Sequence, residues 1–382
     1  MGRLLIIFTD QENQMSNDQT RILELESLRG LAALLVVLFH LPKWNPILNL
    51  NLINNSYLMV ELFFVISGFV IFKAYSERIT SWFDLLKFQF LRFGRLYPLH
   101  LLFLLVFLGL EIMKFIGVSR YGLDKTRVPP FSMNNAAEFI EHIFLLQAVL
   151  PYSNTATFNA PSWSISVEFY TYIIFGLIIL LFKRVKTLAL ALLCTVAMLL
   201  LITQSTFGME PVLRGLAGFF LGTLTAHLVG ERSVSLPKYT SLLILLLMGI
   251  YLQLKMDARY DFVIFFLTAA LIASLVLNTS GWLNNILSKK PLTWLGELSY
   301  SVYMSHVFII WVATNFLKRV LKRTEVQGLY GAWATPLSLF ETLVAVTVIV
   351  FLIFITSQIL YLRFEKPFRE WSRGFISSQK PT

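Results

Sequence analysis

Apolar residues along the chain are gathered into runs of about twenty, the length of helix that crosses the hydrocarbon core of a bilayer. Polar residues, glycine and proline separate the runs. This pattern predicts an all-α, polytopic membrane protein with about ten transmembrane helices. The predicted spans are residues 22–41, 57–75, 96–116, 162–182, 187–204, 211–229, 240–255, 262–279, 294–316 and 335–362.

The loops between the spans predict an orientation. If the N-terminus is cytoplasmic, the loops and tails on that side hold more Lys and Arg than those on the other side, as the positive-inside rule requires. We therefore expect cytoplasmic tails at 1–20 and 371–382 and one membrane-embedded domain at 21–370. The longest loop, 117–160, contains the stretch "AAEFIEHIFLLQAVL", which is too short to span and is typical of a re-entrant or interfacial helix.

Composition agrees with a membrane protein: 56% of the 382 residues are hydrophobic and 14% are charged, unlike an ordinary soluble domain. The apolar stretch in the opening "MGRLLIIFTD" is too short for a cleavable signal peptide. We therefore expect the first span to serve as an uncleaved insertion signal in the cytoplasmic membrane. One cysteine excludes disulfides, and the scattered histidines predict no metal site. The net charge of +10 fits cytoplasmic loops and anionic headgroups rather than nucleic acid.

Titratable side chains within apolar spans are costly and usually mark function. Arg29 and His40 lie eleven positions apart in "LRGLAALLVVLFHLP", so they share one helix face and stand about 16 Å apart along its axis. Arg29 would lie near the cytoplasmic end and His40 in the outer half of the membrane. The alternatives are an arginine that snorkels to headgroups and a histidine at the interface.

Two further clusters hold candidate chemistry. Arg92 and Arg95 are neighbours on a helix at the cytoplasmic start of the third span. Two guanidinium groups at this spacing suit a phosphate ligand. The alternative is that positive-inside topology alone places them there. In "NAPSWSISVEFYTYIIF", Ser164 and Glu168 share a face. Glu168 is expected at the depth of His40, where a carboxylate could fix the imidazole tautomer; the alternative is a structural hydrogen bond.

Two other stretches are interpreted as structural. In "WLGELSYSVYMSHVFIIW", small residues allow close helix contact, and His306 in mid-span favours a structural hydrogen bond. In "VELFFVISGFVIF", Glu61 lies near a helix end and Gly68 allows tight packing.

Five motifs in this order resemble the acyltransferase-3 family of integral membrane acyltransferases, over about positions 20–370. They are Arg29 and His40, ten residues between them; "FFVISGF" from Phe63 to Phe69; Arg92 and Arg95, followed by "LYP"; "WSISVEFYTY" from Trp163 to Tyr172; and "LGELSYSVYMSH" from Leu295 to His306. The chain departs from the family at Phe169, where a second acidic or polar residue is usual.

The resemblance implies an O-acyltransferase that moves an acyl group, usually acetyl, from cytoplasmic acyl-CoA to a hydroxyl of a surface polysaccharide, a lipid-linked sugar or peptidoglycan. It implies that His40 is the general base, with Glu168 as the candidate to orient it. Arg92 and Arg95 would hold coenzyme A phosphates, and Arg29 would lie along the donor's path. The motif residues expected to support the site are Trp163, Ser164, Ser166, Tyr300 and His306.

The expected partners are acyl-CoA as co-substrate, a carbohydrate acceptor, membrane lipids and polysaccharide-assembly proteins, with no permanently bound cofactor and no nucleic acid. Family members that modify peptidoglycan often carry an extra hydrolase-like domain, so the end at residue 382 predicts a standalone enzyme for a capsule, exopolysaccharide or O-antigen unit, or for a glycoside. No nucleophile stands out, which favours direct transfer. The alternatives are a secondary transporter or flippase that uses the same Arg, His and Glu, and a non-catalytic scaffold.

Overall fold

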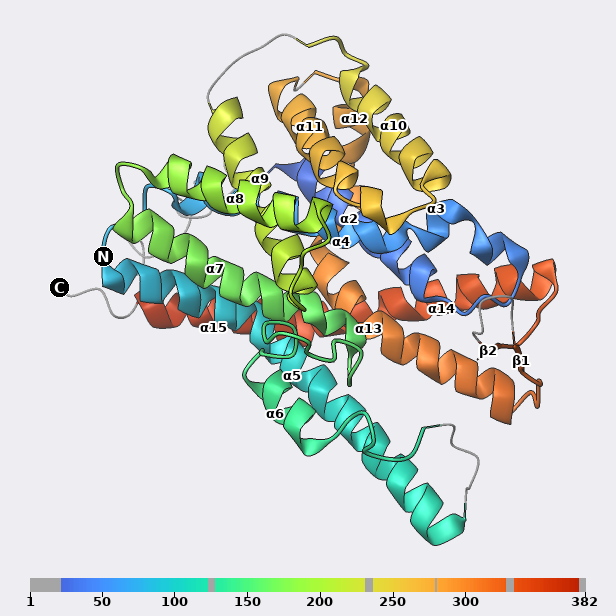
Figure 1. The fold of residues 1–382 in the computed structure, drawn as a ribbon. Coiled ribbons are helices and arrows are strands. Elements are labelled where there is room, and N and C mark those ends of the chain that lie inside the picture. Colours follow the sequence, from blue (N-terminus) through green and yellow to red (C-terminus); the bar gives the residue numbers. More distant parts are fainter. Residues whose placement is uncertain (1–21, 123–127, 231–235, 279, 328–332, 378–382) are drawn as a thin grey trace, which may run out of the picture.

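A computed structural model describes residues 22–122, 128–230, 236–278, 280–327 and 333–377. Within these ranges the regular secondary structure is almost entirely helical, which confirms the all-α class (Figure 1). The long helices are α2 (Leu23–His40), α4 (Met59–Tyr75), α5 (Trp82–Tyr121), α7 (Trp163–Leu181), α8 (Lys186–Ile202), α9 (Glu210–Val229), α10 (Thr240–Leu254), α11 (Val263–Leu277), α13 (Lys290–Arg319), α14 (Leu339–Leu360) and α15 (Lys366–Ser377).

Short elements connect the long helices. They are η1 (Pro46–Asn49), α3 (Asn51–Asn54), η2 (Ser56–Leu58), α6 (Ala136–Ile143), η3 (Ala160–Ser162), η4 (Ala258–Tyr260), α12 (Trp282–Leu287), the π-helical turn η5 (Tyr361–Glu365), and the antiparallel strands β1 (Val326–Gln327) and β2 (Trp333–Ala334). Helix α6 falls in the stretch of the long loop for which a short helix was expected.

Seven helical stretches among the described residues are long and apolar enough to cross a membrane, so the protein is a multi-pass membrane protein. Helices occupy all ten predicted spans, but the count of about ten crossings is not confirmed. Helices α8 and α10 are apolar but shorter, and α2 carries Glu24, Glu26 and Arg29. The cytoplasmic placement of the termini stays a prediction, and the predicted tail 1–20 lies outside the described residues.

Helix α5 is much longer than predicted, because it begins at Trp82 and not at residue 96. A capping box starts it: the Ser81 hydroxyl accepts from the Asp84 backbone N–H, and the Asp84 carboxylate accepts from the Ser81 N–H. Forty residues give a helix of about 60 Å, twice the hydrocarbon thickness. Arg92 and Arg95 therefore lie well inside a continuous helix and not at its start.

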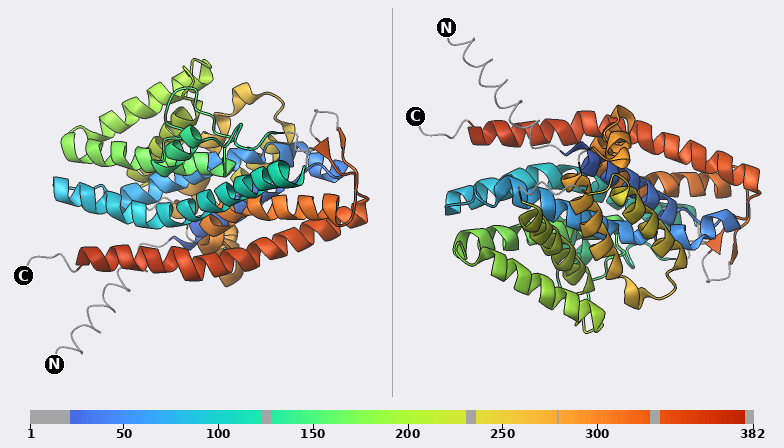
Figure 2. Two further views of the ribbon diagram at one scale, coloured as in Figure 1. Left: turned by 90° about the horizontal axis from the view of Figure 1, so that it is seen from below. Right: turned by 90° about the horizontal axis from the view of Figure 1, so that it is seen from above.

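The bundle has two polar ends. At the His40 end, α2 finishes and α4, α7 and α9 begin; at the arginine end, α4 and α7 finish, α5 begins, and α15 packs alongside. Figure 1 shows α15 and the start of α5 on the left and the strands β1 and β2 on the right. Phe90 on α5 contacts the rings of Trp371 and Phe375, with centroids 5.7 and 5.4 Å away. Helix α15 runs beside the start of α5 (Figure 2). The predicted boundary at 370 lies within α15.

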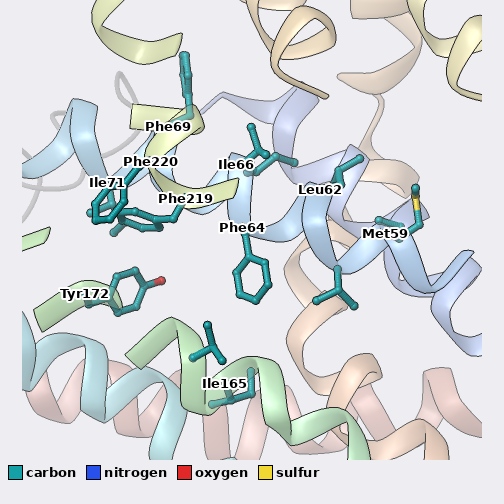
Figure 3. Close-up of a cluster of buried hydrophobic side chains, with 14 of the residues drawn as sticks. Met59, Leu62, Phe64, Ile66, Phe69, Ile71, Ile165, Tyr172, Phe219 and Phe220 are labelled. Atoms are coloured by element: carbon teal, nitrogen blue, oxygen red, sulfur yellow. The ribbon is translucent and has the colours of Figure 1, made fainter. Parts of the chain in front are cut away.

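Helices α4 and α9 lie with their backbones in contact because glycine stands at the crossing. A Cβ atom at Gly68 would collide with the Phe219 carbonyl, and one at Gly222 with the Val65 carbonyl. The expected role of Gly68 in tight packing is thereby confirmed. Figure 3 shows the large side chains that fill the space around this crossing, including Phe64, Phe69, Ile165, Tyr172, Phe219 and Phe220.

Replacing Gly68 by leucine should destabilise the fold, because the α4 and α9 backbones would have to separate. Overpacking of this kind costs about 1–3 kcal/mol, which for a chain of 382 residues lowers Tm by about 1–4 °C. Thermal unfolding of the purified protein in detergent measures the change. The control is Gly109→Leu, since a Cβ at Gly109 meets nothing within 4 Å. Equal Tm values for the two variants would contradict the packing argument.

Candidate functional site

His40 ends α2 and contacts a second histidine. Its Nδ1 lies 2.9 Å from the Val36 carbonyl oxygen and 3.3 Å from Nε2 of His306, which is fully buried on α13. The other ring nitrogen of His306, Nδ1, lies 2.8 Å from the Tyr303 carbonyl oxygen. The histidine that the sequence favoured as structural is therefore the direct neighbour of the predicted base.

These contacts select one pair of neutral tautomers. A carbonyl oxygen can only accept, so His306 Nδ1 must carry its proton, and His306 Nε2 is then an acceptor. His40 Nδ1 faces two acceptors, the Val36 oxygen and His306 Nε2, and must also carry its proton. The remaining nitrogen, His40 Nε2, then has a lone pair with no hydrogen-bond partner in the described part of the chain, which is what a general base needs.

Glu168 does not lie beside His40, so its predicted depth and its pairing with the imidazole are wrong. Its Oε1 accepts from the Ser67 hydroxyl at 2.7 Å and from the Tyr172 hydroxyl, which links α7 to the middle of α4. The cause is helix geometry: Trp163 is the α7 residue that lines the cavity of His40, and five further residues move Glu168 about 7.5 Å deeper and to another face.

A pocket of about 230 Å³ opens beside His40. Its lining includes the polar and aromatic side chains of His40, Tyr57, Trp163, Arg214 and Tyr303. Ser164 lies behind the wall: its hydroxyl is 2.9 Å from the Tyr303 hydroxyl, which donates to the Pro161 carbonyl at 2.8 Å. Trp163 thus lines the pocket, whereas Ser164 fixes a residue that does.

Arg214 is a site residue that the sequence interpretation missed. From α9 its guanidinium pairs with Glu61 at 2.5 Å and lies 4.8 Å from the centroid of a Trp163 ring. Glu61, only 1% exposed, was expected to be structural, and it does anchor this ion pair. The available signal was a charged residue within the apolar run 211–229, the same criterion that had selected Arg29.

At the arginine end, Arg92 and Arg95 extend from α5 toward other helices. Arg92 donates to the Tyr75 hydroxyl at 3.3 Å, and its guanidinium carbon lies 5.4 Å from the Tyr75 ring centroid. Arg95 interacts electrostatically with Arg29, Glu168 and Tyr172. The structure therefore brings the three predicted donor-site arginines into one cluster and places Glu168 within it.

Helix α15 and the turn η5 add groups that sequence reasoning missed. Glu365, 4% exposed, accepts from the Ser301 hydroxyl at 2.9 Å and interacts with Arg95 and Arg369. Arg373 interacts with Arg369, Arg92 and Arg95. No residue of the stretch "RFEKPFREWSR" was among the predicted site residues, and only its packing against α5 reveals its place in the cluster.

Two of the expected supporting residues hold backbones together. Tyr300 on α13 donates to the Leu96 carbonyl at 2.5 Å, next to Arg95 on α5. Ser166 donates to the Leu145 carbonyl at 2.5 Å and ties α7 to the loop after α6. Tyr300 therefore supports the arginine cluster, and Ser166 supports the loop that precedes α7.

The tautomer assignment predicts which histidines react with diethyl pyrocarbonate, which attacks an accessible nitrogen lone pair. His40 should be modified together with the exposed His227, whereas His306, with both ring nitrogens in hydrogen bonds, should stay unmodified. Peptide mass spectrometry of the native protein in detergent measures this. An unmodified His40 beside a fully modified His227 would contradict the assignment.

Comparison with known proteins gives a family and several relatives. The family model described as "Acyltransferase domain" matches residues 22–362. A Bacillus subtilis (strain 168) protein provisionally named a peptidoglycan O-acetyltransferase is 25% identical over 326 residues, 76% of this chain and 49% of that protein. The peptidoglycan O-acetyltransferase of Listeria monocytogenes is 25% identical over 336 residues, 77% of this chain and 50% of that protein.

A third relative, an acyltransferase of Streptomyces mycarofaciens, is 32% identical over 168 residues, 41% of this chain and 40% of that protein. The chain thus spans about half the length, or less, of these relatives. No solved structure matches it. Because the family model covers nearly all of the described helices, the chain belongs to the acyltransferase-3 family of membrane O-acyltransferases.

Proposed function

We propose that this protein transfers an acyl group, acetyl in the simplest case, from acyl-CoA to a carbohydrate hydroxyl, with His40 as the general base. The observation that carries the proposal is the contact of His40 Nδ1 with Val36 and His306, which leaves Nε2 without a partner among the described residues in a histidine that lines a pocket. His306 is a positioning residue in this scheme. Glu168 acts at the arginine cluster and not on the imidazole.

The donor's phosphates bind at the arginine end. Five guanidinium groups gather there, from Arg29, Arg92, Arg95, Arg369 and Arg373, and they outnumber the carboxylates of Glu26, Glu168 and Glu365. The Nε atoms of Arg92 and Arg369 are buried and have no hydrogen-bond acceptor among the described residues. An excess of guanidinium with unused donors suits the phosphates of coenzyme A.

The reaction follows from these two ends. The pantetheine arm carries the thioester from the phosphates at the arginine end toward His40. The acceptor hydroxyl gives its proton to His40 Nε2 while its oxygen attacks the thioester carbonyl, so that a C–O bond forms and the C–S bond breaks. The imidazolium then returns the proton to the departing thiolate. This direct route needs no protein nucleophile and no resident cofactor.

The chemistry assigns an orientation and an acceptor class. Acyl-CoA is cytoplasmic, so the arginine end faces the cytoplasm, the His40 end faces outward, and the protein lies in the cytoplasmic membrane. Two relatives carry peptidoglycan in their names. The acceptor is accordingly a cell-envelope glycan, either peptidoglycan or another surface polysaccharide.

Replacing His40 by alanine should reduce turnover by at least about a hundredfold, the usual contribution of a general base. The assay follows free thiol released from acetyl-CoA in the presence of envelope glycan, together with label transferred from the acetyl group. The control is His227→Ala, an exposed histidine away from the pocket. Full acylation by the His40 variant would indicate a scaffold, and absence of thiol release by the wild type would favour a transporter.

Replacing Arg92 by alanine should raise the KM for acyl-CoA by about tenfold or more, since hydrogen bonds to charged groups contribute on this scale. The acceptor KM should change little, because the two ends of the bundle are far apart. Arg184→Ala, which removes an exposed arginine at the same end, serves as the matched control. A donor KM equal to that of the wild type would count against this phosphate site.

A further inference from the structure

A second pocket lies next to the His40 pocket and has no part in the reaction described above. It measures about 210 Å³ and lies between α4, the loop after α8, the start of α9 and η4–α11. Its polar lining includes Glu61, Gln204, Glu210, Arg214, Arg259 and Asp261. Arg214 lines both pockets, so its side chain forms part of the wall between them.

The chemistry of this second pocket points to a ligand that donates hydrogen bonds. Glu61 is 1% exposed, and both of its contacts with Arg214, at 2.5 Å, go to Oε1. Its other oxygen, Oε2, is buried without a hydrogen-bond partner among the described residues. An unsatisfied buried carboxylate oxygen is costly, so a hydroxyl placed there would gain a strong hydrogen bond.

The charge balance indicates that the ligand is neutral. The carboxylates of Glu61, Glu210 and Asp261 face the guanidinium groups of Arg214 and Arg259, and Lys255 pairs with Asp261 at 2.7 Å. Acidic and basic groups are therefore matched, unlike the arginine end, where cations are in excess. A pocket that is lined by both hydrogen-bond donors and acceptors and carries no net charge suits a polyhydroxylated ring.

The second pocket is joined to the first by shared contacts. Tyr57 lines the His40 pocket, yet its hydroxyl donates at 2.6 Å to Asp261 in the second pocket. Phe262 and Phe265 add apolar surface to the lining. The volume is below the roughly 300–1,000 Å³ of pockets for drug-sized ligands, so it fits a single sugar ring.

We propose that this second pocket is an acceptor subsite, which binds the sugar unit next to the one acylated at His40. The inference rests on the proposed function, since it assumes that the acceptor is a glycan. It makes Glu61 and Arg214 recognition residues as well as an ion pair. The enzyme should then prefer acceptors of two or more sugar units over single sugars.

The test compares acceptors by size. Peptidoglycan and surface polysaccharide from the cells that produce this protein are digested and separated into monosaccharide and oligosaccharide fractions. Each fraction is incubated with labelled acetyl-CoA and the purified full-length chain. We expect the acceptor KM to be lower for oligosaccharides by at least about tenfold, the scale of hydrogen bonds to charged groups. Glu61→Gln and Arg259→Ala should raise the oligosaccharide KM toward the monosaccharide value.

The controls separate the possible failures. Arg259 is exposed, so Arg259→Ala keeps the test valid even if the Glu61 variant fails to fold, and Arg120→Ala removes an exposed arginine that lines neither pocket. Equal KM values for both size classes in the wild type, or a preference that survives both variants, overturn the subsite alone. Absence of label in every fraction overturns the proposed function, and the subsite with it.

Discussion

A charged side chain inside an apolar helix bundle must be paired, and this constraint organises the whole molecule. Arg214 on α9 is held by Glu61 on α4, and Glu365 in the π-helical turn is held by Ser301 on α13. Each pair joins helices that are distant in sequence. The polar groups are therefore both the chemistry of the protein and the contacts that fix which helices are neighbours.

The same constraint separates the two ends of the site. Along α2, the face that carries Arg29 and His40 has the buried residues Ala33 and Val36 between them. Polar groups gather on both sides of this apolar layer, around Arg29 on one side and around His40 on the other. The proposed donor, with an anionic head and a long, uncharged arm, would suit such a layout, with the head at the guanidinium groups and the arm directed toward the imidazole.

The fold was largely predictable because helices in lipid must be long and apolar, and each predicted span contains a helix. The prediction of helix boundaries fails where a helix, or part of one, is not apolar enough to be recognised as a span. The first part of α5 carries Lys87, Arg92 and Arg95, which lower its hydropathy, yet Ser81 and Asp84 start the helix there. Helix α15 is amphipathic and packs against α5 along one face, so its role could not be read from hydropathy.

Candidate site residues could be selected from the sequence by their chemistry, but their partners could not. His40 and His306 are 266 positions apart, and nothing in one sequence states that α2 and α13 are adjacent. Glu168 was assigned to His40 because a carboxylate is the commonest partner of a catalytic imidazole. Here His306 occupies that position, where its Nε2 can hold the proton on His40 Nδ1 without placing a negative charge beside the proposed base. Such an arrangement suits a low-dielectric setting, where an added carboxylate would itself need a partner.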